Sequence, residues 1–523
     1  MNNERAWIFA GMLSLGILLN ATPSVAEDTT AVTGAGDTAI YVKERAAQLA
    51  AKPYVEPPAV TSNQLASSYD EYRQVRFKPD RARWRNSPSK FEVQLLPMGW
   101  LFKHPIKLWL VEGGKPVEVR ATHEDFVDSR SSAQEPSPSA SSDEAIPLSG
   151  FRINWPLNDP TRTDEVIVFQ GATYFRALAA SQRYGLSMRA LAIKTASQSG
   201  EEFPEFREFW IEKPEQGADS IKIHALLDSP SASGAFTFIV RPGGSTTINV
   251  SATLYPRVDI NEVGIAPLTS MYMIGPVDRS RLSDYRPQVH DSDGLAILNN
   301  WGERIWRPLA NPRELQMSMF VDEGNRGFGL IQRERRFERY EDLEARYDLR
   351  PSVWVEPLSE FGQGSVVLVE IPTELEIHDN IVAFWRPRAR LKAGKTYDYT
   401  YRLHVQNDTP TRSSGPYVHS TRSGPSHFSK KGNGKVLFVV DYKDGEKPME
   451  TSEFTTRATA SHGTIKNISV GSNSLTGGLR VSFEFDPKDG NTSDLRLDLQ
   501  RKAGDAGQLT KNPEPWFYRW TRK

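Results

Sequence analysis

The chain has 523 residues, enough for two or more domains, and 38% of them are hydrophobic, which is sufficient for a sizeable core. A formal net charge of -1 provides no long-range field that would favour nucleic acid or an anionic membrane surface, so a neutral ligand fits the chain better than a charged one. The chain has no cysteine, which excludes disulfides, thiolate catalysis and cysteine-ligated zinc.

Residues 1–26 have the pattern of a secretory signal peptide. Arg5 precedes an apolar stretch from Trp7 to Leu19, and the segment ends in small residues where a signal peptidase cuts. The apolar stretch is too short for a stable membrane span, so we expect cleavage after Ala26; an uncleaved anchor is the alternative. Nothing else in the sequence is long and apolar enough to cross a bilayer, so we expect a mature protein without a transmembrane segment, located outside the cytoplasm.

The mature chain is expected to begin with two short helices and to continue as strands. Residues 40–51 have apolar side chains at helical spacing, and a second short helix is expected within 67–75. One helical turn or more is also expected in 174–184. Short alternating or β-branched runs separated by turn residues predict strands at 91–96, 106–111, 115–121, 165–169, 220–227, 235–241 and 246–254.

Many short strands with little helix indicate an all-β fold, with a large antiparallel β-sandwich rather than a βαβ arrangement. Residues 129–149 are rich in Ser, Pro and Ala and are expected to form a surface loop. Regularly spaced strands near the end of the chain indicate a second, immunoglobulin-like β-sandwich. The predicted organisation is a signal peptide (1–26), a large β-sandwich (27–405), a linker (406–428) and an immunoglobulin-like domain (429–523).

Two acidic loops contain the candidate catalytic carboxylates. Asp379 ends an acidic segment between two apolar, β-branched runs, 369–373 and 381–385, which together predict strand, turn and strand. The second loop contains Asp291 and Asp293. Glycosidic bond cleavage generally needs two carboxylates, and these loops could supply them. Spacing alone is weak support, because most acidic turn residues are solvated or cap a backbone N–H group.

A series of longer sequence segments occurs in a fixed order along the chain. They are Gly171–Arg176, Tyr184–Ser187, Ser199–Pro204, Phe206–Trp210, Ala225–Pro230, Ala266–Met271, His290–Leu295, Trp306–Leu309, Arg346–Ser352 and Asp379–Ala383. Over about residues 46–401, these segments closely resemble the glucans biosynthesis protein family, types G and D (OpgG/OpgD), periplasmic proteins of Gram-negative bacteria. The resemblance implies a large N-terminal β-sandwich of the galactose-mutarotase type joined to a C-terminal immunoglobulin-like domain.

The resemblance also implies a part in the biosynthesis of osmoregulated periplasmic glucans, whose backbone is β-1,2-linked glucose. Members of the family include inverting β-1,2-glucanases and related transglycosylases, and their general acid and general base correspond to Asp379 and Asp291. Tyr347 lies in a segment, 340–352, that resembles the loop covering the cleft of the active members. The further residues expected to contact substrate are Asp293, Arg350, Trp306 and Trp385.

A general acid at neutral pH needs a raised pKa. The pKa of aspartic acid is ordinarily near 3.9, so Asp379 must be kept protonated by burial or by a neighbouring carboxylate. Glu374 and Glu376 are the sequence neighbours that could do this. The sequence does not distinguish type G from type D. The His-Asp-Ser-Asp segment at 290–293 resembles type D, whereas the predicted signal peptide has no twin arginines and resembles type G.

The alternative to an enzyme is a glucan-binding accessory protein of the inner-membrane glucan glucosyltransferase. In that case aromatic side chains would guide the glucan, and the candidates are Trp210, Trp306, Trp354 and Trp385. The presence of both Asp291 and Asp379 favours the enzyme, because a binding groove has no particular need for either. No cofactor is expected, and the two His-Asp pairs offer too few ligands at fixed spacing for a metal site.

Overall fold

The structure is a computed structural model that describes residues 37–60, 66, 68–129, 145–279, 282–408, 415–426, 434–445, 447–502 and 513–522. The predicted signal peptide lies outside the described residues, as do most of the predicted surface loop and parts of the predicted linker. Nearly all regular structure in the described ranges is β-strand, which confirms the all-β prediction.

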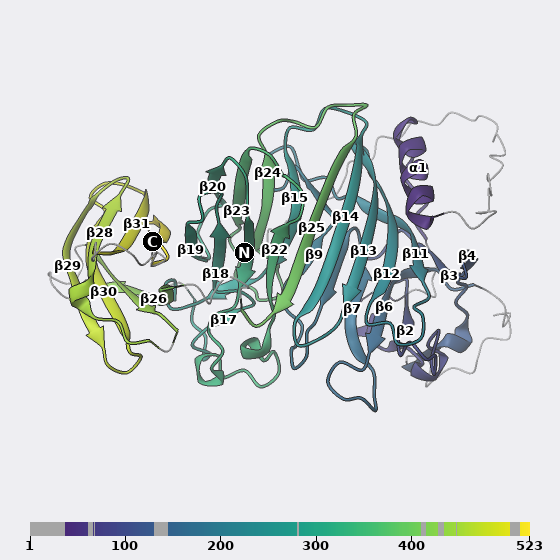
Figure 1. The fold of residues 1–523 in the computed structure, drawn as a ribbon, viewed down its shortest axis with the longest axis horizontal. Coiled ribbons are helices and arrows are strands. Elements are labelled where there is room, and N and C mark those ends of the chain that lie inside the picture. Colours follow the sequence, from purple (N-terminus) through teal and green to yellow (C-terminus); the bar gives the residue numbers. More distant parts are fainter. Residues whose placement is uncertain are drawn as a thin grey trace, which may run out of the picture.

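The helix α1 (Thr38–Ala50) packs on the outer face of the larger sandwich, at the end opposite the smaller sandwich (Figure 1). Its N-cap is Asp37, whose carboxylate accepts a hydrogen bond from the amide of Ala39 at 2.9 Å. Its Val42 and Ala46 are buried against a cluster that includes Trp210. The second helix, α2 (Tyr69–Tyr72), is short, and both helices fall where the sequence predicts them.

Two large sheets pack face to face to form the larger sandwich. The first sheet contains, in spatial order, β2 (Glu92–Pro97), β6 (Leu148–Trp155), β7 (Asp164–Gln170), β8 (Tyr174–Ala177), β9 (Ser187–Arg189), β15 (Val263–Ser270), β24 (Ile381–Pro387), β23 (Gly364–Glu370) and β20 (Gln316–Asp322), with β10 (Leu191–Ile193) paired to β15. The second sheet contains β19 (Arg304–Pro308), β18 (Gly294–Leu298), β21 (Gly327–Ile331), β22 (Ser352–Pro357), β25 (Tyr397–Gln406), β14 (Thr246–Pro256), β13 (Ala232–Arg241), β12 (Ile221–Asp228), β11 (Glu205–Glu212), β3 (Lys107–Glu112) and β4 (Lys115–Glu118). Two strand pairs lie outside these sheets, β1 (Val75–Phe77) with β5 (Phe126–Asp128) and β16 (Tyr272–Ile274) with β17 (Val289–His290).

The main core lies between the two large sheets. Phe151 and Phe169 of the first sheet meet Phe209 and Phe238 of the second, with ring centroids 4.9 to 5.4 Å apart in edge-to-face arrangements. Each such buried side chain contributes about 1.5–3 kcal/mol through removal of apolar surface from water. Trp385 of β24 belongs to the same core.

The smaller sandwich consists of strands β26 to β32 and lies at one end of the molecule, yellow in Figure 1. One of its faces contains β26 (Tyr417–Pro425), β27 (Val436–Lys443), β30 (Gly478–Asp486) and β29 (Thr464–Asn473), and the other contains β28 (Phe454–Ala460), β31 (Thr492–Arg501) and β32 (Trp516–Thr521). Strand β32 also pairs in parallel with β19, where Trp516 lies opposite Trp306. The second sheet therefore continues from the larger sandwich into the smaller one.

Two local predictions are wrong. Residues 174–184 are not helical, since 174–177 form β8, which pairs with β7 on one side and β9 on the other. Residues 417–425 were expected in the linker but form β26, whose Val418 is fully buried in the core of the smaller sandwich. In both segments, pairing with the neighbouring strands outweighs the local sequence pattern.

Candidate active site

Asp379 lies in the loop that joins β23 to β24. These strands are antiparallel neighbours, with Val369 opposite Val382, which confirms the predicted strand, turn and strand. The next residue, Asn380, is buried and donates hydrogen bonds to the carbonyl oxygens of Tyr272 at 3.0 Å and Ile371 at 2.9 Å. The backbone at Asp379 is therefore held in place, while its side chain keeps 34% of its surface exposed.

Asp291 directly follows β17 and is almost completely buried. Its amide donates to the carbonyl oxygen of Met271 at 2.9 Å, and its side chain is 9% exposed. A nitrogen of the Arg350 guanidinium lies 3.5 Å from Oδ1 of Asp291. That oxygen accepts no hydrogen bond from the described residues. Asp291 is thus a buried carboxylate with one incompletely satisfied oxygen.

The two acidic loops come together closely enough for their charges to interact. Burial raises the pKa of Asp291 to about 6, the nearby charge of Asp379 adds to the rise, and Arg350 opposes it. Burial also raises the pKa of Asp379, against the opposing effect of Arg176, whose guanidinium lies 3.8 Å from its carboxylate. Of the two causes expected for a raised pKa of Asp379, burial is the one found, and neither Glu374 nor Glu376 is among the groups that shift it.

Tyr347 and Glu376 tie the 340–352 segment to the loop of Asp379. The hydroxyl of Tyr347 donates to Oε2 of Glu376 at 3.0 Å. Arg286 donates to the same oxygen at 2.7 Å and to Asp342 at 2.7 Å. The ring of Tyr347 is buried, and the guanidinium of Arg350 lies 5.0 Å from its centroid. Three separate loops are therefore cross-linked by polar contacts around the two aspartates.

Asp293 has a structural contact set of its own. Its Oδ2 accepts hydrogen bonds from the backbone amides of Arg333 and Glu334, the latter at 2.7 Å. Its Oδ1 lies 3.4 Å from Nε2 of His290, a buried imidazole whose pKa is lowered by burial. Both oxygens of this carboxylate therefore contact groups of the protein, and the carboxylate holds the chain that follows β21 in position. The expected contact of Asp293 with substrate gains no support from this arrangement.

The four tryptophans that were expected to guide a glucan are buried. The exposed fractions of Trp210, Trp306, Trp354 and Trp385 are 1%, 4%, 3% and 0%. The indole of Trp385 donates to the carbonyl oxygen of Phe361 at 3.3 Å inside the core. The guanidinium carbon of Arg333 lies 3.5 Å from the centroid of the Trp306 ring. This burial gives no support to the prediction that Trp306 and Trp385 contact substrate at the site of the two aspartates.

Two side chains at the site were not identified from the sequence, namely Arg176 and Arg286. Arg176 lies on β8, and its Nε donates to Ser187 Oγ on β9 at 2.7 Å. Arg176 could have been noticed in the sequence, because it is a charged residue between apolar residues in a short segment. Arg286 offered no such signal, because its three carboxylate partners come from three parts of the chain.

Two aspartates with raised pKa values on adjoining loops can divide the roles of general acid and general base. The part of the chain that the structure describes contains no group of three or more His, Asp or Glu placed to hold a metal ion. In the same part, no helix has the length and apolar character needed to cross a membrane.

The chain was compared with known proteins. A family model described as "Periplasmic glucan biosynthesis protein, MdoG" matches residues 38–520. The glucans biosynthesis protein G of Vibrio cholerae serotype O1 is 47% identical over 493 residues, which cover 94% of this chain and 88% of the relative. The protein of the same name from Rhodopseudomonas palustris is 44% identical over 520 residues, which cover 99% of this chain and 100% of the relative. Among solved structures, a galactose mutarotase related enzyme from Lactobacillus acidophilus covers 46% of this chain and 97% of its own, with 8% identity and a TM-score of 0.22, too low to support an argument.

Proposed function

The chain belongs to the periplasmic glucan biosynthesis protein family, and from this premise we propose that it acts on the β-1,2-glucan backbone as an inverting glucanase or transglycosylase. The observation that supports the proposal is the meeting of Asp291 and Asp379, two aspartates with raised pKa values from separate loops. A protein that only binds a neutral glucan has no need for this pair. The substrate class comes from the family resemblance, and the assignment of roles comes from matching its motifs.

In the proposed reaction Asp379 is the general acid and Asp291 is the general base. Asp379 gives its proton to the departing glycosidic oxygen as the bond from that oxygen to the anomeric carbon breaks. Asp291 takes a proton from a water molecule, or from a sugar hydroxyl, that attacks the anomeric carbon from the opposite face. Attack by water gives hydrolysis, and attack by a sugar hydroxyl gives transglycosylation.

The two environments fit these roles. A pKa of about 6 leaves Asp291 mainly ionised at pH 7, so that it can accept a proton. Its unsatisfied Oδ1 is the atom to which an attacking hydroxyl would donate, because a buried acceptor without a donor is costly. Burial favours the neutral form of Asp379, which is the form that a general acid requires.

The polar contacts of Tyr347 support a covering role for the 340–352 segment. Its hydrogen bond to Glu376 joins this segment to the loop of Asp379. A segment that closes over the substrate excludes water, and this exclusion decides between hydrolysis and transfer to another sugar. Tyr347 and Arg350 are therefore proposed to contact the glucan at the site.

The proposed location is the periplasm, reached through the predicted signal peptide at residues 1–26. The proposed partners are the glucan itself and the inner-membrane glucan glucosyltransferase, whose product would be the substrate here. The alternative proposal, a non-catalytic accessory protein of that glucosyltransferase, loses its predicted aromatic track because all four tryptophans are buried.

The experiment that tests the proposed function uses residues 27–523 and their Asp379→Asn variant with linear β-1,2-glucan. Product size and new reducing ends are followed, and glucan binding is measured in parallel. We expect the wild type to alter the size of the glucan. We expect the variant to bind the glucan without altering its size. Shorter products with new ends indicate hydrolysis, and new products without added ends indicate transglycosylation. Binding without any change to the polymer by either protein contradicts catalysis and favours the accessory function.

A further inference from the structure

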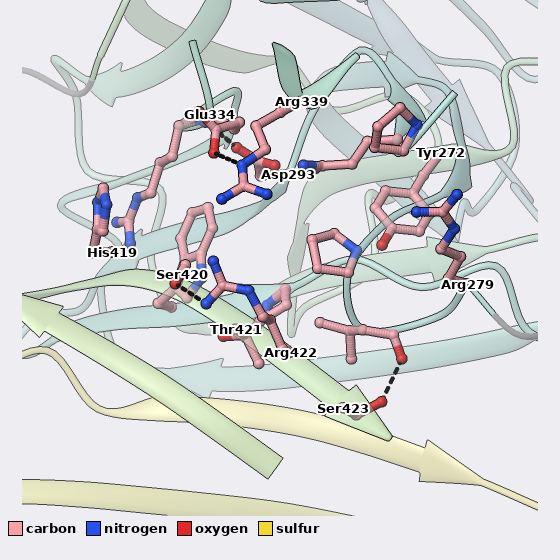
Figure 2. A pocket seen from close by; sticks show the side chains of 17 residues that line it. Tyr272, Arg279, Asp293, Glu334, Arg339, His419, Ser420, Thr421, Arg422 and Ser423 are labelled. Atoms are coloured by element: carbon pink, nitrogen blue, oxygen red, sulfur yellow. Dashed lines mark hydrogen bonds and ion pairs between the residues drawn. The ribbon is translucent and has the colours of Figure 1, made fainter. Parts of the chain in front are cut away.

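A cavity of about 350 Å³ lies at the junction between the two sandwiches (Figure 2). Residues of the larger sandwich between 272 and 339 form most of its wall, and residues 419–423 of β26 close it from the smaller sandwich. We call it the junction cavity. Its size falls within the range of small-molecule sites, and neither Asp291 nor Asp379 lines it.

The wall of the junction cavity carries more positive than negative charge. Its arginines are Arg279, Arg333, Arg339 and Arg422, whereas its carboxylates are Asp293 and Glu334. In Figure 2 the side chains of Arg339 and Arg422 point into the cavity, one from each sandwich. Like charges in one cavity repel each other, and the repulsion is relieved when an anion lies between them.

The carboxylates near Arg339 and Arg422 are already bound to other arginines. Glu334 accepts hydrogen bonds from two nitrogens of Arg336 at 2.9 and 2.7 Å, and its contact with Arg339 is longer, at 3.8 Å. Arg422 donates to the carboxylate of Asp441 at 3.0 Å and to the hydroxyl of Ser420 at 3.1 Å. Arg480 binds the same carboxylate through two nitrogens, at 2.7 and 3.0 Å. Arg339 and Arg422 therefore each share one negative charge with a second arginine and are only partly neutralised.

Arg333 supplies an independent observation. Its side chain is 8% exposed, and its terminal nitrogens form a two-fold ion pair with Glu514 at 2.9 Å. Its Nε is nevertheless buried without an acceptor among the described residues. The remaining carboxylate, Asp293, is occupied by backbone amides and cannot supply one. A buried donor beside a positively charged cavity points to an acceptor on a ligand.

We propose that the junction cavity binds a small molecule that carries an oxyanion, either a phosphate ester or a carboxylate. The planar fork of a guanidinium matches both groups with two parallel hydrogen bonds. Such a ligand contacts Arg339 of the larger sandwich and Arg422 of the smaller one, and it thereby stabilises their arrangement. This site is separate from the proposed catalytic pair and does not depend on the proposed function.

The proposal is tested by calorimetric titration of residues 27–523 with glucose 6-phosphate, with glucuronate and with glucose. Glucose 6-phosphate and glucuronate distinguish the two oxyanions, and glucose controls for sugar binding. We expect one of the two anions to bind, glucose not to bind at the same concentration, and the affinity to fall as sodium chloride is added. If neither anion binds, or if glucose binds equally well, the proposal is overturned.

The matched variants are Arg339→Gln, Arg422→Gln and, as a control, Arg457→Gln, an exposed arginine outside the cavity. We expect the first two to weaken anion binding by about ten-fold or more, and the control to bind like the wild type. Arg339→Lys keeps the charge but loses the fork, so we expect an intermediate affinity and an undisturbed fold. Equal losses in all three glutamine variants, or no loss in Arg339→Gln and Arg422→Gln, contradict the site.

Discussion

Asp291 and Arg350 form an incomplete ion pair: a guanidinium nitrogen lies 3.5 Å from Oδ1 of the carboxylate, and no described residue donates a hydrogen bond to that oxygen. Burial alone would favour the neutral acid, and Arg350 offsets part of this effect. The balance leaves a carboxylate that can take up a proton near neutral pH.

Replacement of Arg350 by Met is expected to raise the pKa of Asp291 above its value of about 6, because the opposing positive charge is lost. A general base must be deprotonated, so activity falls as pH decreases through its pKa. The acidic limb of the kcat/KM profile on β-1,2-glucan should therefore lie near pH 6 in the wild type and at higher pH in Arg350→Met. Arg350→Lys, which keeps the charge, is the control, and an unshifted limb in Arg350→Met contradicts Asp291 as the base.

Asp291→Asn is expected to stabilise the protein at pH 7.5. The pKa of Asp291 is higher in the folded state than in the unfolded state, so the folded protein binds this proton more tightly, and stability falls as pH rises from about 4 to about 6. A rise from 3.8 to about 6 corresponds to about 3 kcal/mol at most. We expect urea unfolding to show a gain of about 1–3 kcal/mol at pH 7.5 and almost none at pH 4. A loss of stability at pH 7.5 contradicts this account of the buried carboxylate.

Tyr347→Phe is expected to lower kcat/KM by about ten-fold without moving the acidic limb of the pH profile. The substitution removes the hydrogen bond to Glu376 at 3.0 Å but leaves both aspartates in place. Tyr69→Phe, at an exposed tyrosine of α2, serves as the control. If Tyr347→Phe shifts the limb, its hydroxyl affects the titration of Asp291 and does not merely hold the loop.

Trp385→Phe is expected to leave glucan affinity unchanged, because the indole is fully buried and donates its hydrogen bond to the carbonyl oxygen of Phe361. Trp385→Ala should instead cost about 3–5 kcal/mol of unfolding free energy through the cavity it creates. Denaturant unfolding and glucan titration measure the two effects. If the Trp385→Phe variant is folded but has lost its glucan affinity, this prediction is contradicted and Trp385 contacts the substrate, as the sequence predicted.

The sequence contained enough information for the fold class and for the two aspartates. The runs on either side of the acidic segment predicted β23 and β24, and the structure confirms them as neighbours with Asp379 in the loop just before β24. The surroundings of the two aspartates were harder to predict from the sequence, because each aspartate contacts residues that are distant in the chain. Arg176 reaches Asp379 only because β8, β9, β15 and β24 are consecutive in the first sheet.

Burial of the tryptophans could not be read from the sequence. An aromatic residue on a strand has the same alternating pattern whether its face is covered by a second sheet or open to a ligand. Trp306 is covered because β32 pairs with β19, and that pairing joins residues more than 200 positions apart. Segment 417–425 was missed for a related reason, since its Ser and Thr content is typical of a linker and only its pairing with β27 makes it a strand.

Asp291 and Asp379 are proposed to act together in one reaction on a glucan. The most direct measurement is the rate of product formation from linear β-1,2-glucan by the wild type, Asp291→Asn, Asp379→Asn and the double variant, with the exposed Asp489→Asn as control. We predict that each single variant loses most activity while binding glucan, that the double variant loses little more, and that the control is unaffected. Full activity in either single variant contradicts the claim.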